Sequence, residues 1–320
     1  MNGKIIKNIS NDYTVLSEGK TYTCKARGKI RNMKITPLVG DEVIFDSNNC
    51  YILEILPRRN ELLRPPVSNI DQAFIITSVK QPDFSSNLLD KLLTIIEFNN
   101  IKPIICFTKL DLLNDQERTT INSIIHYYEQ IGYTIYLNTE IEKIKQSFSN
   151  KVTIFTGQSG AGKSTLLNHL DASLQIKTAP ISLALGRGKH TTRHTELLKF
   201  SNGFVADTPG FSALSFVDMT PQDIRDNFIE FNKYREFCKY KDCMHDKEDQ
   251  CEIKNKVNEE IILKSRYDNY LKFISEKRWY YEIVRFYIRF NSQNKRRNSK
   301  DFSFRIRLHS CWCNGWRFCS

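Results

Sequence analysis

The sequence predicts a chain of several domains: a small N-terminal β-barrel, a central α/β domain and a helical C-terminal region with a metal site. Three observations predict this. Residues 1–66 hold five short strand-like segments separated by turn signals, as in small barrels. From Ala73 onward, buried-type strands alternate with helices, which is typical of a parallel sheet covered on both faces. Residues 219–284 are helix-rich and hold three cysteines around one histidine.

The expected barrel strands are short and evenly spaced, with turns such as Gly40-Asp41 and Asn48-Asn49 between them. They are residues 4–7, 13–16, 21–25, 42–45 and 51–56. Five such strands favour a barrel of the oligonucleotide-binding (OB) type. The basic stretch at residues 24–34 would lie on a strand and the loop after it, where such a barrel contacts RNA. A solvated strand with no partner is the alternative.

Pro65-Pro66 is expected to break the chain before the α/β domain, which should span residues 70–218. The pattern predicts strands at 74–79, 104–107, 134–137 and 152–156, and helices at 88–98 and 115–131.

A phosphate-binding loop (P-loop) follows the strand at 152–156, because Gly157 to Ser164 match G-x-x-x-x-G-K-[ST] and open a helix. Backbone N–H groups of such a loop surround phosphates, and the helix N-terminus adds its positive end. Lys163 should reach the β- and γ-phosphates, and Ser164 should offer its hydroxyl to Mg²⁺. The expected phosphate-binding residues are Gly157, Gln158, Ser159, Gly160, Ala161, Gly162, Lys163, Ser164 and Thr165.

A second motif selects the base. It consists of Thr108, Lys109, Leu110 and Asp111, which follow the strand at 104–107. The Asp111 carboxylate can accept two hydrogen bonds from guanine. Adenine has neither donor at that position, so a buried Asp111 would be left without hydrogen-bond partners when ATP is bound. The usual first residue of this motif is Asn, and Thr108 has an oxygen with shorter reach. We therefore expect guanine specificity and some loss of affinity.

Two switch-like segments lie downstream. A strand at 204–207 ends in D-T-P-G, where Asp207 would hold Mg²⁺ through water and the Gly210 N–H would contact the γ-phosphate. In the loop at 186–193, Thr192 is the expected magnesium ligand. The order along the chain is thus the base-recognition motif at 108–111 (the base loop), the P-loop, the first switch at 186–193 and the second switch at 207–211. Nothing is missing, so the sequence predicts a circularly permuted GTPase domain, since a parallel sheet tolerates being cut and rejoined in its loops.

A metal site is expected within residues 219–284. Cys238, Cys243, His245 and Cys251 supply three thiolates and one imidazole, a complete tetrahedral set for a structural Zn²⁺. Cys24, Cys50 and Cys106 stand apart and are expected to be plain buried thiols. Lys239, Lys241 and Lys247 flank the site and face either RNA or solvent.

The chain resembles the small ribosomal subunit biogenesis GTPase A family. The supporting stretches are VGDEV, LLRPPVSNIDQ, FTKLDLL, GQSGAGKSTLLN, GRGKHTTRHTEL, DTPGF and CKYKDCMHDKEDQC, which lie within residues 1 to about 275. The resemblance implies an OB barrel, a permuted GTPase domain and a zinc domain. It also implies GTP-dependent binding to the small ribosomal subunit and its 16S-type rRNA during late maturation. Asn138-Thr139 stand where the family has a Ser-Ala-like loop against the base.

Hydrolysis requires an oriented water, which many GTPases place with a Gln after the second-switch glycine. Phe211 occupies that position here, so His190 is the catalytic candidate beside Lys163 and Thr192, with His194 the weaker choice. The resemblance supports His190. We expect a GTPase that is slow alone and stimulated by the small ribosomal subunit. The alternatives are an RNA-binding zinc scaffold that holds GTP as a structural ligand, and a P-loop ATPase or kinase, against which Asp111 argues.

The formal charge of +11 is concentrated at the C-terminal end, where residues 285–320 carry nine Lys or Arg and one acid. Two interpretations are open for this tail: a basic arm, or an end produced by a frameshift or read-through. No apolar run reaches the roughly 18 residues of a membrane helix, and no secretory stretch begins the chain. We expect a cytoplasmic monomer with no membrane contact.

Overall fold

The computed structural model of the chain describes residues 1–28, 30, 35–63, 66–171, 196–207 and 215–294, with only the backbone at Leu63, Asp207 and 280–294. The chain divides into two compact units, Met1–Ile274 and Ser275–Ser320; of the second, residues 275–294 are described. Among the described residues, no helix combines the length and the apolar character needed to cross a bilayer.

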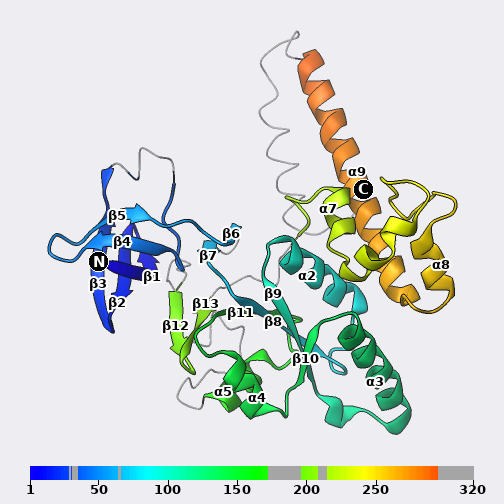
Figure 1. Cartoon of the computed structure of the whole chain (residues 1–320), viewed down its shortest axis with the longest axis horizontal. Coiled ribbons are helices and arrows are strands. Elements are labelled where there is room, and N and C mark those ends of the chain that lie inside the picture. Colours follow the sequence, from blue (N-terminus) through cyan, green and yellow to red (C-terminus); the bar gives the residue numbers. More distant parts are fainter. Residues whose placement is uncertain (29, 31–34, 64–65, 172–195, 208–214, 295–320) are drawn as a thin grey trace, which may run out of the picture. The chain divides into compact units, whose positions relative to one another are not determined.

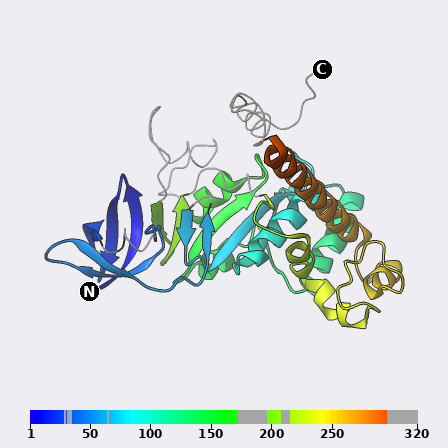
Figure 2. The ribbon, with the colours of Figure 1, turned by 90° about the horizontal axis from the view of Figure 1, so that it is seen from above.

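The N-terminal strands form the expected barrel (blue in Figures 1 and 2). They are β1 (Asn2–Ile9), β2 (Asp12–Ser17), β3 (Lys20–Ala26), β4 (Glu42–Asp46) and β5 (Tyr51–Ile55). The ring closes in the order β1-β2-β3-β5-β4, because β1 pairs with both β2 and β4. Only the pairing of β3 with β5 is parallel. Alternate residues of β2, β3 and β4, such as Tyr13 and Val15, are buried in the barrel core.

The central domain is a sheet with the strand order β10-β9-β8-β11-β13-β12. Its strands are β8 (Gln72–Ser78), β9 (Lys102–Thr108), β10 (Thr134–Leu137), β11 (Val152–Gly157), β12 (Glu196–Phe200) and β13 (Gly203–Asp207). All but β12 run parallel. The strands that precede β11 in the chain lie on one side of it, and those that follow lie on the other. The chain therefore passes through β9, which ends at the Thr108 motif, before it reaches β11, the strand of the P-loop, and this order confirms the predicted permuted α/β fold.

Helices cover both faces of this sheet (Figure 1). One face packs against α2 (Ser86–Phe98) and α3 (Asp115–Gln130), whose apolar side chains meet Ala73 and Ile75. The other packs against α4 (Ile141–Ser147) and α5 (Lys163–Leu170), which meet Phe74 and Ile76. Both faces of β8 are therefore buried, which explains its continuous apolar run.

Short elements join the barrel to the sheet. A two-stranded hairpin, β6 (Glu61–Leu63) and β7 (Pro66–Ser68), stands where we expected only a break, since Pro66 begins a strand. The strand β12, which the sequence pattern did not predict, pairs with β13 and reaches β1 at Glu196 and Lys7. Those two side chains form an ion pair at 3.0 Å.

The C-terminal region is helical, as expected. It contains α7 (Pro221–Asp226), the 3₁₀ turns η4 (Ile229–Lys233) and η5 (Arg235–Phe237), α8 (Glu252–Asn258) and α9 (Lys264–Asn294). Phe228, Phe231 and Tyr270 are fully buried in its core. The helix α9 continues past residue 285, where we placed the start of the basic tail.

Candidate nucleotide site and metal centre

The P-loop joins the C-terminal end of β11 to α5. Gly157 has a φ of +127°, and a Cβ at this position would lie 2.0 Å from the Ile76 carbonyl oxygen of the neighbouring strand. Gly162 precedes the first helical residue with a φ of +90°. Glycine is therefore required at both ends of the turn, by close packing at the first and by backbone conformation at the second. The loop between them can present its N–H groups to an anion.

Lys163 begins α5, and its ammonium group lies over the loop. Its Nζ donates to the carbonyl oxygens of Gly157 at 2.9 Å and Gln158 at 2.7 Å. Burial lowers the pKa of Lys163, because the charged form is partly removed from water. Ser164 and Thr165 follow in the first turn of the helix, beside the positive end of its dipole.

The base loop contacts the P-loop directly, although more than 50 residues separate them in the chain. Thr108, buried at the end of β9, donates from Oγ1 to the Ala161 carbonyl oxygen at 2.7 Å. Lys109 donates from Nζ to the Gly160 carbonyl oxygen at 2.8 Å and also to the carbonyl of Gln81. The structure thus places the two predicted motifs at one edge of the sheet. No local sequence signal indicated the contact with Gln81.

Asp111 lies in the 3₁₀ turn η1 (Leu110–Leu112), and its side chain is exposed, while Leu110 is half-buried. The pairing of Asp111 with guanine stays a prediction. A base stacked at this edge would cover the carboxylate. The loop of Asn138 and Thr139 follows β10 at the same edge, where the Asn138 N–H donates to the Phe107 carbonyl at 2.9 Å.

The switch segments are mostly outside the described residues. Asp207 ends β13, which pairs in parallel with the P-loop strand β11, so its backbone reaches the same edge of the sheet. Its side chain is not described. The other predicted residues that lie outside the described part are His190, Thr192, His194, Gly210 and Phe211.

The predicted metal ligands come together in the C-terminal region. The ligand atoms of Cys238, Cys243, His245 and Cys251 all lie within 4.8 Å of one another. His245 Nδ1 is 3.3 Å from Cys251 Sγ and 3.7 Å from Cys238 Sγ, and these two sulfurs are 4.0 Å apart. Two sulfurs bound tetrahedrally to one zinc ion would be about 3.8 Å apart. The donor set and its spacing therefore fit a closed tetrahedral metal site.

The environment of this cluster disfavours charge on its ligands unless a cation is bound. Burial raises the pKa of Cys251 to about 12 and lowers the pKa of His245 to about 4. The backbone around His245 is fixed by two tyrosines of α9: Tyr267 donates to the His245 carbonyl at 2.6 Å and Tyr270 to the Met244 carbonyl at 2.5 Å. The cluster is thus held by the core of its own region.

A third group of polar side chains was not expected from the sequence. Arg266 of α9 is fully buried against Asp90 of α2 and Glu230 of η4. One signal could have found it: Leu263, Arg266, Tyr270 and Phe273 recur at helical spacing, which places the arginine on the apolar face.

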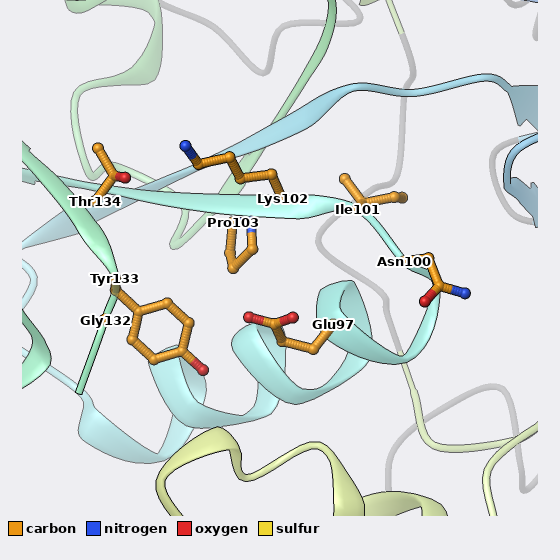
Figure 3. Close-up of a pocket in the computed structure, with 8 residues that line it drawn as sticks. All are labelled: Glu97, Asn100, Ile101, Lys102, Pro103, Gly132, Tyr133 and Thr134. Carbon is orange, nitrogen blue, oxygen red and sulfur yellow. The ribbon is translucent and has the colours of Figure 1, made fainter.

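A pocket of about 380 Å³ lies at the end of the sheet where β9 and β10 begin (Figure 3). Lys102 and Thr134, at the starts of β9 and β10, line it together with Glu97 and Tyr133. Burial raises the pKa of Glu97. Because parallel strands bring their starts to one edge and their ends to the other, this pocket is separate from the nucleotide site.

The permuted strand order and the direct contact between the base loop and the P-loop together define the class of protein, which is a circularly permuted P-loop GTPase. The comparisons with known proteins agree. The family model described as RsgA GTPase matches residues 55–217, and the model described as RsgA N-terminal domain matches residues 2–51. The chain belongs to the RsgA GTPase family.

Relatives match over most of the chain. It is 49% identical over 282 residues to the small ribosomal subunit biogenesis GTPase RsgA of Enterococcus faecalis, covering 86% of this chain and 95% of that protein. It is 50% identical to RsgA 2 of Oceanobacillus iheyensis, covering 86% and 96%. Among solved structures, it resembles YloQ, a circularly permuted GTPase, with a TM-score of 0.75 and 40% identity over 87% of this chain and 94% of that one. YjeQ from Thermotoga maritima matches with a TM-score of 0.75 and 32% identity, covering 86% and 97%.

Proposed function

We propose that this GTPase binds the small ribosomal subunit late in its maturation and hydrolyses GTP to control its own binding and release. The observation that carries the proposal is the direct contact between base loop and P-loop, with Thr108 bonded to Ala161 at 2.7 Å. This contact makes one site for base and phosphates. The assignment to the ribosomal subunit is supported by the relatives, which are named as small ribosomal subunit biogenesis GTPases.

In this proposal, each part of the site has one task. The N–H groups from Gly157 to Thr165 surround the phosphates, and Lys163 exchanges its bonds to loop carbonyls for bonds to the β- and γ-phosphates. Asp111 accepts two hydrogen bonds from guanine while Lys109 holds the loop beneath the base. His190 orients the attacking water. Because Phe211 cannot do so, free turnover should be slow, of the order of 10⁻⁴ to 10⁻² s⁻¹.

Two metals belong to the proposal. Zn²⁺ in the Cys238, Cys243, His245 and Cys251 site has a structural role, because four protein ligands leave no position for substrate. Mg²⁺ arrives with GTP, and Ser164, Thr192 and Asp207 would hold it. When bound, it neutralises charge that develops on the phosphates.

The proposed domains are an RNA-binding barrel at residues 1–66, the GTPase domain at 70–218 and the zinc domain at 219–284. The second switch, Asp207 to Phe211, precedes the zinc domain by only a few residues. The γ-phosphate could therefore pull on this domain through Gly210, so that GTP fixes the placement of two rRNA-binding modules. We further propose that the protein acts as a cytoplasmic monomer.

GTP turnover with and without purified small ribosomal subunits tests the proposal. We expect slow turnover alone, a rise with small subunits and no rise with large subunits. Binding to small subunits should be tighter with a non-hydrolysable GTP analogue than with GDP. Turnover and binding that ignore the small subunit would refute the ribosomal role and leave a GTPase with another partner.

A further inference from the structure

Two cysteines that seemed isolated in the sequence are neighbours in the barrel. Lys25 of β3 pairs with Tyr51 of β5, and Ala26 pairs with Ile52. Cys50 is the residue just before β5 and has a φ of +53°, so the regular strand geometry ends there, next to Cys24 of β3. The Lys25 N–H donates to the Cys50 carbonyl oxygen at 3.0 Å, which fixes the two backbones side by side at this step. Cys24 is buried, as we expected, whereas Cys50 is only partly buried and the two residues are neighbours rather than isolated.

The pairing of β3 with β5 is compatible with a disulfide at this point. Neighbouring strands lie about 4.8 Å apart, and bridged cysteines have Cα atoms roughly 4.4–6.8 Å apart. Both side chains also point the same way: Cys24 is fully buried in the barrel core, and Cys50 packs against the same core. Both are free thiols in the structure.

The two thiols differ in their access to solvent. Burial, with Cys50 as the second cause, raises the pKa of Cys24 to about 11, so this thiol stays protonated at neutral pH. Cys50 is only half-buried, in the turn between β4 and β5, where its sulfur is 3.7 Å from the Ser47 carbonyl oxygen. An oxidant in solution therefore meets Cys50 first, and Cys24 is placed to react second.

We propose that Cys24 and Cys50 form a modification site, a dithiol that hydrogen peroxide converts into a reversible disulfide between β3 and β5. The Cys50 thiolate attacks one peroxide oxygen, the O–O bond breaks, and one water leaves after protonation. The sulfur of Cys24 then attacks the resulting sulfenic acid, the S–S bond forms, the S–O bond breaks and a second water leaves. The two thiols are oxidised by two electrons, and one peroxide is reduced to two waters. A dithiol reductant reverses the reaction.

The position of the site implies a consequence for nucleic-acid binding, and this part rests on the proposed function. OB barrels bind oligonucleotides with strands 2 and 3 and with the loop between strands 4 and 5. The disulfide would tie that loop to β3. The exposed side chains of Lys25 and Tyr51 flank the two cysteines, so the bridge would shift a cation and an aromatic ring on this face. Oxidation should therefore weaken RNA binding by the barrel.

Peptide mapping of the full-length protein tests the modification. After treatment with hydrogen peroxide and alkylation, trypsin should yield residues 21–25 linked to residues 35–58. The link should disappear with dithiothreitol and in Cys24→Ser and Cys50→Ser. Cys106, fully buried in the sheet, is the internal control and should remain reduced. Failure of this linked pair to form, while other thiols of the chain oxidise, would overturn the proposal.

RNA binding tests the consequence. With a fluorescent single-stranded RNA, we expect the oxidised protein to bind at least threefold more weakly, and Cys50→Ser to be unaffected by peroxide. If the oxidised and reduced proteins bind RNA equally well, the disulfide does not control binding. If the reduced protein binds no RNA, the RNA-binding role of the barrel fails, while the linked peptide still decides whether the site exists.

Discussion

The guanidinium of Arg266 lies 2.6 Å from the carboxylate of Asp90, with both side chains fully excluded from solvent. The same guanidinium bonds Glu230 at 2.5 Å and stands 4.6 Å from the ring of Phe228. Asp90 also accepts a bond from the Tyr128 hydroxyl at 2.6 Å. Through this cluster, α9 and η4 of the C-terminal region are joined to α2 and α3 of the GTPase domain.

Arg266→Ala should destabilise the protein by about 3–5 kcal/mol, because it leaves two carboxylates buried without their cation. Urea unfolding followed by circular dichroism measures the loss. Lys264→Ala on the same helix is the control, because its pair with Asp268 is exposed and is worth at most about 1 kcal/mol. Equal effects of the two substitutions would show that the buried cluster does not stabilise the contact between the C-terminal region and the GTPase domain.

Thr108→Val should weaken the binding of GTP and GDP alike, by roughly tenfold. The substitution preserves shape but leaves the Ala161 carbonyl without its donor, at a cost of about 1–3 kcal/mol that loosens the P-loop. Titration with a fluorescent guanine nucleotide measures it. Thr119→Val, on the exposed side of α3, should change nothing. An unchanged affinity in Thr108→Val would mean that the bond does not support the site.

Asp111→Asn should lower GTP affinity by on the order of 100-fold and raise affinity for xanthosine triphosphate. The amide replaces one of two acceptors with a donor, and each charge-assisted hydrogen bond is worth about 1.5–3 kcal/mol. Competition binding with the two nucleotides measures the exchange. Asp115→Asn, four residues away and also exposed, should keep the parent's preference. Equal binding of ATP and GTP by the parent protein would refute guanine specificity altogether.

Cys243→Ser should abolish metal binding and unfold the region around residues 230–255, because metal binding and folding are linked. Elemental analysis of the reduced, freshly purified protein should find one zinc per chain in the parent and none in the variant. Cys50→Ser lies outside the cluster and should keep its metal. Absence of zinc from the parent protein would refute the structural role.

His190→Ala should remove most of the stimulation by small ribosomal subunits while keeping GTP-dependent binding to them, if His190 orients the attacking water. Turnover and subunit binding are measured side by side. His194→Ala tests the weaker candidate from the same loop and should retain stimulation. A fully stimulated His190→Ala would assign the water-orienting group to the ribosomal subunit instead.

Much of this protein could be predicted from local sequence patterns. The P-loop from Gly157 to Ser164 is defined by glycines that allow the turn and by the strand and helix on either side of it. The three cysteines and His245 were identified from their spacing, because all four lie within 14 residues. The barrel strands were predicted closely, because turn residues such as Gly40-Asp41 and Asn48-Asn49 mark where each short strand ends.

The tertiary structure decided what depends on distant partners. Whether Arg266 is a solvated cation or a buried one depends on Asp90, 176 residues away, and the sequence around either residue does not specify the other. Cys24 lies beside Cys50 because β3 and β5 pair in parallel across the barrel. Local patterns reflect conformational preference and periodicity, which act over a few residues. The pairing of strands and the burial of charged groups depend on packing between segments that are distant in the sequence. The energy of this packing is gained only when those segments come together in the folded chain.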